Sequence, residues 1–316
     1  MISARPKLCY KSTGGSFRHG AGLVLKIAIT GGNGFVGSDL AILLAQLGHQ
    51  VVIVSRRQAP RLDFASTISA DINDLDSLLT AFASCDAVAH CAGINRQQDT
   101  QTFKRVHVEG TKNVVSACQK QGVKKLVLTS FLKARADSGS PYHESKWLAE
   151  EVVRSCDLDY TILKPGVIFG QGDHMIKHMS SALKLSPFFA LIGADVSLRP
   201  VALADFSRII AACLHDARLS KSSFAVLGPE KLRLSEAARR VASAMGRPVI
   251  PVPMPLAFCY ALAHVLEATM KEPLLSIAQI KMIAEGLAEV LPGERELPDD
   301  LKPRLVFSLE LLKAAL

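Results

Sequence analysis

The chain has 316 residues, of which 49% are apolar and 21% are charged, so its composition excludes an intrinsically disordered protein and allows one large α/β domain with a smaller lobe. Its net charge of +8 suits an anionic nucleotide or an acidic membrane surface, and because no basic stretch is interleaved with aromatic residues we expect no nucleic-acid binding. The seven cysteines are scattered and form no C-x-x-C pair, which indicates buried thiols in a reducing compartment rather than disulfides or a zinc site.

Residues 1–23 precede the first predicted strand and differ from the rest of the chain. Residues 1–22 contain Arg5, Lys7, Lys11 and Arg18 but no acidic residue, and they lack the apolar core of a secretory signal. Three interpretations stay open: a mitochondrial transit peptide, a disordered leader, or an upstream start that the cell does not use. We therefore expect a cytoplasmic protein, peripheral to the inner membrane if it docks there, or a mitochondrial-matrix protein if the segment is a transit peptide. No apolar run reaches the ~18 residues that a membrane span requires.

A glycine-rich turn between a strand and a helix organises the N-terminal half. Leu25–Thr30 reads as a buried strand, glycines follow at positions 31, 34 and 37, and Leu40–Leu47 has a helical pattern. The first glycine allows a sharp turn, the second lets backbone amides approach a diphosphate, and the third lets the helix pack close to the sheet. A tight turn without a ligand is the alternative. The residues predicted to surround the diphosphate are Gly31, Asn33, Gly34, Phe35, Val36 and Gly37.

The next strand, His49–Val54, leads to residues that would select the cofactor. An acidic residue after it would favour NAD, but Arg56 and Arg57 stand there and could bind a 2′-phosphate through bidentate contacts. We therefore expect NADP(H) rather than NAD(H), with a solvated arginine pair as the alternative. Asp71 could accept a hydrogen bond from the adenine amino group or cap a turn, and Ile72 could pack against the ring.

Small residues follow the strand Asp86–His90. Cys91, Ala92 and Gly93 would let a cofactor lie across the end of this strand. His90 and Cys91 have no nearby partners that would complete a metal site, and no metal is expected.

The residues with the most chemistry follow the strand Lys124–Thr129. Tyr142 and Lys146 lie four residues apart on one face of a predicted helix. The lysine ammonium would favour the phenolate of Tyr142, which could then act as an acid/base, and Lys146 could also hold the nicotinamide ribose. A solvated helix face is the alternative.

Beyond the strand Asp159–Leu163 and residue 170, the alternation of strands and helices becomes irregular. We expect residues 24–170 to form a Rossmann domain whose sheet is completed by later elements, and residues 171–316 to form a smaller lobe. His174 and His178 are spaced four apart, but a surface face is favoured over a metal site. Leu256–Leu266 predicts a strongly apolar helix, which either packs in the core or contacts a partner or a membrane surface.

These motifs together resemble the extended and atypical short-chain dehydrogenase/reductases, a group that is similar to NAD-dependent epimerases and dehydratases. The likeness is closest to the branch that contains the nucleotide-binding accessory subunit of respiratory complex I and its bacterial relatives, and it covers roughly residues 25 to 285. It implies an α/β Rossmann fold, a doubly wound parallel sheet with helices on both faces and a small C-terminal α/β lobe. It also implies that Pro165 and Val167 contact the nucleotide. The motifs are 30–37, Tyr142 with Lys146, 164–173, 198–201 with Asp205, and 227–230.

Three positions depart from the pattern of this family. The catalytic Ser or Thr after the fifth strand falls on Phe131, with Ser130 one position early. The Asn expected before the V-x-G-T motif is His107, and the Arg expected before Pro165 is Lys164. The resemblance therefore implies an intact nucleotide site beside a partial catalytic tetrad.

Two functions of different class follow. In the first, the protein is an NADP(H)-dependent oxidoreductase acting on a carbonyl or hydroxyl group of a small-molecule substrate, with Tyr142 as acid/base, Lys146 lowering its pKa and Ser130 polarising the carbonyl. In the second, it is a non-catalytic nucleotide-binding accessory protein of a respiratory or quinone-related membrane complex, which it contacts through residues 256–266. A nucleotide-sugar epimerase or dehydratase is a third possibility.

Overall fold

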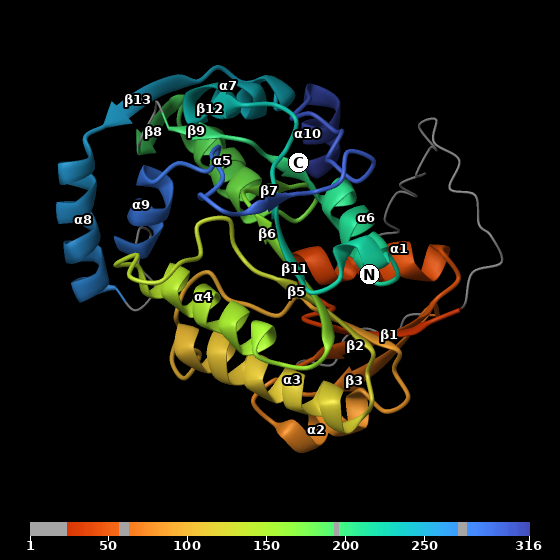
Figure 1. Ribbon diagram of the computed structural model, residues 1–316. Coiled ribbons are helices and arrows are strands. Elements are labelled where there is room, and N and C mark those ends of the chain that lie inside the picture. The colour runs from red at the N-terminus through yellow and green to blue at the C-terminus, as the bar shows by residue number, and fades with distance from the viewer. Residues whose placement is uncertain (1–23, 57–62, 193–195, 271–276) are drawn as a thin grey trace.

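The computed structural model describes residues 24–56, 63–192, 196–270 and 277–316, and its centre is an eight-stranded sheet (Figure 1). All seven neighbouring strand pairs of this sheet are parallel. From one edge to the other the strands are β14 (Arg295–Glu296), β11 (Ser222–Val226), β6 (Asp159–Pro165), β5 (Lys125–Thr129), β4 (Ala87–His90), β1 (Lys26–Thr30), β2 (Gln50–Ser55) and β3 (Ala65–Ser69). The strand order reverses between β1 and β4, which is the switch point of a doubly wound sheet.

Apolar, mostly β-branched residues make β1 the central strand. Ile27, Ala28 and Ile29 are completely buried, as expected for a parallel strand covered on both faces. In the register, Thr30 of β1 pairs with Val54 of β2 and with His90 of β4. The carboxyl ends of these strands therefore meet at one edge of the sheet, and the glycine turn begins there.

Helices cover both faces of the sheet (Figure 1). One face is covered by α1 (Phe35–Gln46) and α6 (Leu203–Cys213), which pack against each other. The other is covered by α2 (Leu75–Ala81), α3 (Gly110–Lys120) and α4 (Pro141–Arg154). The sequence predicted one long helix over 103–121, but a π-helical stretch, η1 (Lys104–Glu109), precedes α3. The predicted Rossmann fold with helices on both faces is confirmed.

The remaining elements form a lobe at the carboxyl end of the sheet. Its helices are α5 (His174–Leu185), α7 (Leu234–Ala244), α8 (Leu256–Thr269), α9 (Ile277–Ala284) and α10 (Leu309–Ala315), with a 3₁₀ turn at Ala217–Leu219 between α6 and β11. Its strand pairs are β7 (Ile168–Phe169) with β10 (Val201–Ala202), β9 (Ser197–Leu198) with β12 (Leu232–Arg233), and β8 (Phe188–Ile192) with β13 (Ile250–Met254). Because β11, β14 and α6 return to the main sheet, the lobe and the sheet are built from interleaved segments.

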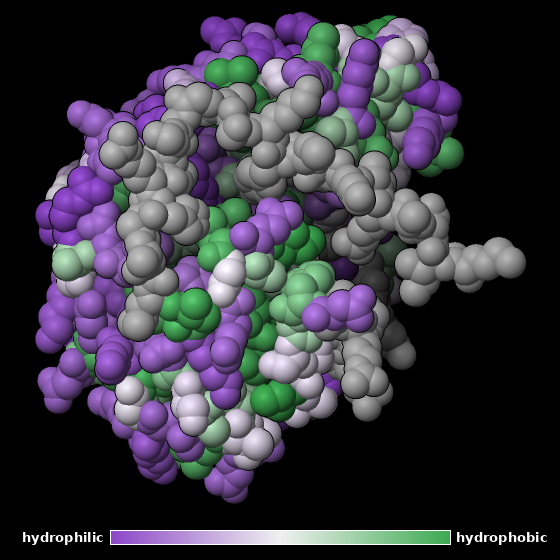
Figure 2. All heavy atoms as spheres, turned by 90° about the vertical axis from the view of Figure 1, so that its right-hand side faces the viewer, coloured by the Kyte–Doolittle hydropathy of each residue, from purple (hydrophilic) through white to green (hydrophobic). Residues whose placement is uncertain are grey.

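On the side that carries α1 and α6, hydrophilic and hydrophobic residues are mixed (Figure 2). On the opposite side, α8 lies at the periphery beyond α9 (Figure 1). Within the described part of the chain, no helix combines the length and apolar character needed to span a bilayer.

Candidate nucleotide site and its neighbours

The glycine turn after β1 brings the ends of two central strands into contact. Gly31 has a φ of +68°, in the left-handed region that favours glycine. A Cβ atom on Gly31 would lie 2.8 Å from Cα of Ala92, which follows β4, so a side chain would prevent this approach. The amide of Gly31 donates to Val54 O at 3.0 Å and ties the turn to β2. The turn therefore lies at the switch point, where open α/β sheets bind nucleotides.

Gly34 and Gly37 shape the start of α1. The N-cap residue Gly34 has no side chain that could accept hydrogen bonds from the first turn of α1. The N–H groups of that turn are therefore available for an anion. A Cβ atom on Gly37 would lie 2.8 Å from Gly32 Cα and closer still to Gly31 O. Gly37 thus packs against the turn itself, whereas the sequence suggested that it packs against the sheet. This cradle, which side chains do not fill, fits a diphosphate.

The residues predicted for the adenosine end lie at one edge of the sheet. Arg56 follows β2 and is exposed, and its carbonyl accepts from Ser69 Oγ at the end of β3. Arg57 lies outside the described residues. Oδ1 of Asp71 accepts from both N and Nδ2 of Asn73 at 2.9 Å, so this carboxylate oxygen caps a turn, one of the two roles left open for it.

Ile72 is buried at the N-terminal end of α3. A Cβ atom on Gly110 would lie 2.6 Å from Cδ1 of Ile72, so glycine is needed at the start of this helix. Ile72 is still 8% exposed, and Ala92, at the end of β4, packs against the same apolar cluster, whereas Cys91 packs against the other one. The structure thus brings Ile72 and Ala92 to the same face of the sheet.

Lys146 of α4 lies beside the end of β4. Its Nζ donates to Thr129 O at 3.2 Å and lies 3.3 Å from where a Cβ on Gly93 would be. An ammonium has three donors, so hydrogen-bonding capacity remains beside the strand ends. Burial lowers the pKa of Lys146 to about 8, although Glu150 and Cys91 act in the opposite direction. Cys91 is half-buried and accepts from Thr129 Oγ1 at 3.7 Å.

His107, which stands where the family has Asn, links the β4 end to α4. Its Nε2 accepts from the amide of Ile94 at 3.1 Å, so Nδ1 carries the proton and donates to Ser145 Oγ at 2.9 Å. Ser145 Oγ in turn donates to the carbonyl of Tyr142 at 2.8 Å. Burial and the charge of Lys146 hold the pKa of His107 well below its usual value. A neutral imidazole therefore positions the start of α4.

A second buried histidine connects β1, β4 and α3. Thr111 Oγ1 donates to the carbonyl of His107, so it accepts from Nε2 of His90 at 3.0 Å. Nδ1 of His90 then accepts from Thr30 Oγ1 at 2.6 Å. Burial first, and the Lys146 charge second, lower the pKa of His90 to about 3. This histidine is structural, as the sequence suggested for the His90–Cys91 pair.

Tyr142 is surrounded by aromatic rings. Its ring centroid lies 5.3 Å from that of Phe131, 5.5 Å from Phe103, 5.6 Å from His107 and 5.8 Å from His143. Burial raises the pKa of the Tyr142 phenol above its usual value. The expectation that the neighbouring ammonium would lower this pKa is therefore wrong, because burial dominates.

Ser130 does not join Tyr142. Its Oγ donates to Oε1 of Glu150, a completely buried carboxylate that also accepts from Lys164 at 3.2 Å and from Arg154 at 2.6 Å. The hydroxyl of Ser130 therefore donates to the ion-pair cluster around Glu150. This contradicts the carbonyl-polarising role expected for Ser130. Phe131 instead packs edge-on against Tyr142 at an interplanar angle of 70°.

The loop after β6 lies next to the β5 loop. The carbonyl of Pro165 accepts from Leu132 N at 2.9 Å, and the carbonyl of Val167 accepts from Val201 N at 2.8 Å. Val167 is half-buried and packs in the same cluster as Tyr142. These two family positions therefore lie near the predicted acid/base.

His143 is a residue that sequence reasoning missed. Its side chain is completely buried and stacks on Phe131 with centroids 5.2 Å apart. Within the described residues neither ring nitrogen has a hydrogen-bond partner, and Nδ1 lies 3.7 Å from Oε1 of Glu285. Burial lowers its pKa, while Glu285 opposes this shift. Its position next to Tyr142 in Tyr-His-Glu-Ser-Lys was the available signal.

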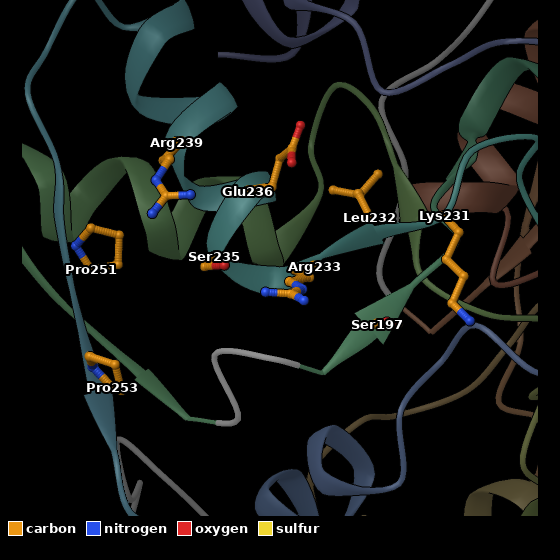
Figure 3. Close-up of a pocket in the computed structure, with 9 residues that line it drawn as sticks. All are labelled: Ser197, Lys231, Leu232, Arg233, Ser235, Glu236, Arg239, Pro251 and Pro253. Carbon is orange, nitrogen blue, oxygen red and sulfur yellow. The ribbon is translucent and has the colours of Figure 1, made fainter.

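A separate pocket of about 630 Å³ lies in the C-terminal lobe (Figure 3). Arg233 of β12 and Arg239 of α7 face Pro251 and Pro253 of β13 across it, while Lys231 extends away from the prolines and pairs with Glu289. None of the residues predicted for the nucleotide lines this pocket. Its other lining residues are Ser197, Leu232, Ser235 and Glu236.

Comparison with known proteins decides the family. A profile described as NAD(P)H-binding matches residues 31–216, more than half of the chain. The chain belongs to this NAD(P)H-binding family.

Three curated relatives each match most of this chain. An uncharacterized protein of Mycobacterium tuberculosis is 27% identical over 259 residues, which are 81% of this chain but only 27% of that protein. The mitochondrial NADH dehydrogenase (ubiquinone) 1 alpha subcomplex subunit 9 of Mus musculus is 26% identical, covering 90% of this chain and 79% of the subunit. The 2-alkyl-3-oxoalkanoate reductase of Stenotrophomonas maltophilia is 28% identical, covering 84% and 89%.

Solved structures agree on the fold. A nucleoside-diphosphate-sugar epimerase of Staphylococcus aureus has a TM-score of 0.72 at 16% identity and covers 92% of this chain and all of its own. The Bordetella bronchiseptica enzyme WbmG, solved in complex with NAD, has a TM-score of 0.66 at 19% identity and covers 94% of both chains. At these identities the likeness shows the fold alone. The predicted resemblance to dehydrogenase- and epimerase-type proteins, the complex I subunit included, is confirmed.

Proposed function

We propose that this protein is an NADP(H)-dependent oxidoreductase in which Tyr142 exchanges a proton with the oxygen of a carbonyl or hydroxyl substrate. The observation that carries the proposal is the position of Lys146, which is buried beside Gly93 with one donor on Thr129 O and donors left for the nicotinamide ribose. The nucleotide supplies or accepts the hydride when it is bound. The reductase relative, whose name specifies an oxoalkanoate, supports a ketone as the substrate class.

Tyr142 is protonated before the reaction, because burial raises the pKa of its phenol. Lys146, on the same helix, would hold the ribose hydroxyls of the nucleotide. Protonated Tyr142 can donate its proton to a carbonyl oxygen as the hydride arrives. His107 and Ser145 hold the carbonyl of Tyr142 and so orient the first turn of α4.

The acid/base role is tested with Tyr142→Phe. We expect at least a 100-fold loss of NADPH-dependent reduction of a 2-alkyl-3-oxoalkanoate, because general acid–base catalysis contributes about 10²–10⁴ in rate. NADPH affinity, measured by calorimetry, should stay within about twofold. Tyr160→Phe, on β6, is the matched control and should retain the rate. Turnover that survives in Tyr142→Phe would exclude Tyr142 as the acid/base.

The preference for NADP(H) rests on Arg56 and Arg57. Replacing both by Ala should remove the difference between NADPH and NADH affinity, because the charged contacts with the 2′-phosphate are lost. The control is Arg239→Ala, an exposed arginine of the C-terminal lobe. Equal affinities of the unsubstituted protein for the two nucleotides would overturn the NADP(H) assignment.

A second function has its own supporting observations. Phe131 occupies the position of the catalytic hydroxyl, and Ser130 is committed to Glu150, which favours a non-catalytic nucleotide-binding accessory protein of a respiratory or quinone-related complex. The relationship to the complex I subunit supports this alternative. Tight NADPH binding without turnover by the unsubstituted protein would favour it. A nucleotide-sugar epimerase would instead interconvert sugars without net NADPH consumption.

A further inference from the structure

Exposed apolar side chains gather on the outer side of the C-terminal lobe. Leu185 is 90% exposed, Phe188 64% and Val265 58%, although isolated monomers rarely expose such residues as a contiguous group. They belong to β8, β13, α8 and the end of α5, which lie along one side of the molecule in Figure 1. We define this outer apolar surface as Leu185, Phe188, Ile250, Val252, Leu256, Phe258, Leu262 and Val265.

The two-stranded ribbon presents one apolar face outward. β8 and β13 are parallel, with Phe188 opposite Ile250 and Ala190 opposite Val252, so these side chains lie on the same face. This face is exposed. On the other face Leu191 is almost completely buried, which anchors the ribbon to the lobe.

Helix α8 continues this surface directly after β13. Phe258, Ala261, Leu262 and Val265 follow the i, i+3, i+4, i+7 spacing of one helix face, and all are exposed. Cys259 and Ala263 lie on the opposite side and are buried in the cluster with α9. Because α8 lacks the length and apolar character needed to span a bilayer, its exposed apolar residues would lie at the interface of a membrane rather than cross it.

The charge around the surface selects the partner. Segments 174–192 and 244–266 contain Lys177, Lys184 and Arg247 and no Asp or Glu, and α8 then continues to a single carboxylate, Glu267. Nη1 of Arg247 donates to the carbonyl of Lys184 at 3.3 Å, which places the guanidinium where the two strands begin. A second copy of the chain would again present three cations and one carboxylate to this surface. Anionic headgroups would instead neutralise the cations.

We propose that this surface binds a bilayer that contains anionic phospholipid. The apolar side chains of α8 and the ribbon enter the headgroup and acyl boundary, while Lys177, Lys184 and Arg247 contact lipid phosphates. The nucleotide site is on other elements, so binding to the membrane does not require turnover.

Flotation of the full chain with vesicles tests the proposal. We expect binding to phosphatidylcholine vesicles that contain phosphatidylglycerol, and at least tenfold weaker binding when phosphatidylglycerol is absent or salt is high. Phe188→Ser with Phe258→Ser should weaken binding at least tenfold, and Lys184→Glu about tenfold. Ile42→Ser with Val306→Ser, which alters exposed apolar residues elsewhere, is the matched control and should bind normally.

Two results would overturn the proposal. The first is the absence of vesicle binding by the unsubstituted protein, or an equal loss in the control variant. The second is a concentration-dependent dimer in sedimentation that Phe188→Ser with Phe258→Ser abolishes, because the surface would then be an interface between copies. Calorimetry with NADPH on each variant shows that the protein is folded, so membrane binding and nucleotide binding are judged separately.

Discussion

Replacing Gly37 with alanine tests the diphosphate cradle without removing any side-chain contact. The added Cβ would lie 2.8 Å from Gly32 Cα and closer still to Gly31 O, and both are backbone atoms that cannot rotate away. The first turn of α1 and the glycine turn must therefore separate. Overpacking of this kind costs about 1–3 kcal/mol of unfolding free energy.

The same displacement should weaken nucleotide binding. It moves the N–H groups of the first turn of α1 away from the diphosphate, and a hydrogen bond to a charged group is worth about 1.5–3 kcal/mol. Losing one such bond corresponds to roughly 10- to 100-fold weaker binding of NADPH. We therefore expect Gly37→Ala to lose nucleotide affinity by this factor while it remains folded.

Calorimetric titration with NADPH, at a temperature where circular dichroism shows a folded protein, measures the effect. Gly48→Ala is the matched control, because Gly48 has a φ of +85° and an added Cβ would meet no atom within 4 Å. This control should lose about 1–2 kcal/mol of stability through backbone strain but no affinity. Unchanged affinity in folded Gly37→Ala would refute the assignment of the diphosphate to the start of α1.

Two further predictions concern buried charge and are checked by urea unfolding. Burial keeps His90 neutral in the folded state with a pKa of about 3, whereas the unfolded chain binds a proton below about pH 6.5, so stability should fall as the pH decreases through this window. Between pH 7 and pH 5.5 His90 contributes about 1 kcal/mol to this loss, and a His90→Asn variant with the same pH dependence would contradict the reasoning. Glu150→Ala should cost about 1.5–3 kcal/mol, because the buried Lys164 keeps only Glu294 as a carboxylate partner and Arg154 loses a charged hydrogen bond. Glu151→Ala, which removes an exposed partner of Arg154, should cost less than about 1 kcal/mol, and equal losses in the two variants would argue against a buried cluster.

The central strands could be predicted because each is marked by residues that lie next to one another in the sequence. A run of β-branched residues followed by three glycines identified β1 and its turn, and the Tyr-x-x-x-Lys spacing identified one face of α4. By contrast, β14 is only two residues long, and its pairing with β11 depends on contacts far along the chain. The strand β13 was missed because it contains Pro251 and Pro253, which argue against a sheet interior but are tolerated at the edge of a two-stranded ribbon.

The environment of Tyr142 could not be predicted from spacing. Lys146 lies on the same helix, but the rings around Tyr142 come from η1, the loop after β5 and α4 itself. Their packing excludes water and raises the phenol pKa, and burial also weakens the tendency of Lys146 to hold its charge. The role of Ser130 failed for a related reason: its partner, Glu150, is twenty residues away and is identified only when α4 packs against β5 and β6.

The two parts of the proposed site depend on different kinds of structure. The proposed diphosphate cradle consists of backbone N–H groups and of space that glycines leave open, so it depends on the path of the chain through the turn. The carbonyl-polarising hydroxyl depends on a single side chain, and the Phe131 ring can occupy its place without moving that path. Nucleotide binding is therefore no evidence of turnover in this protein. The comparison of Tyr142→Phe with the unsubstituted chain has to be made on both quantities, because only a loss of rate at constant NADPH affinity assigns chemistry to Tyr142.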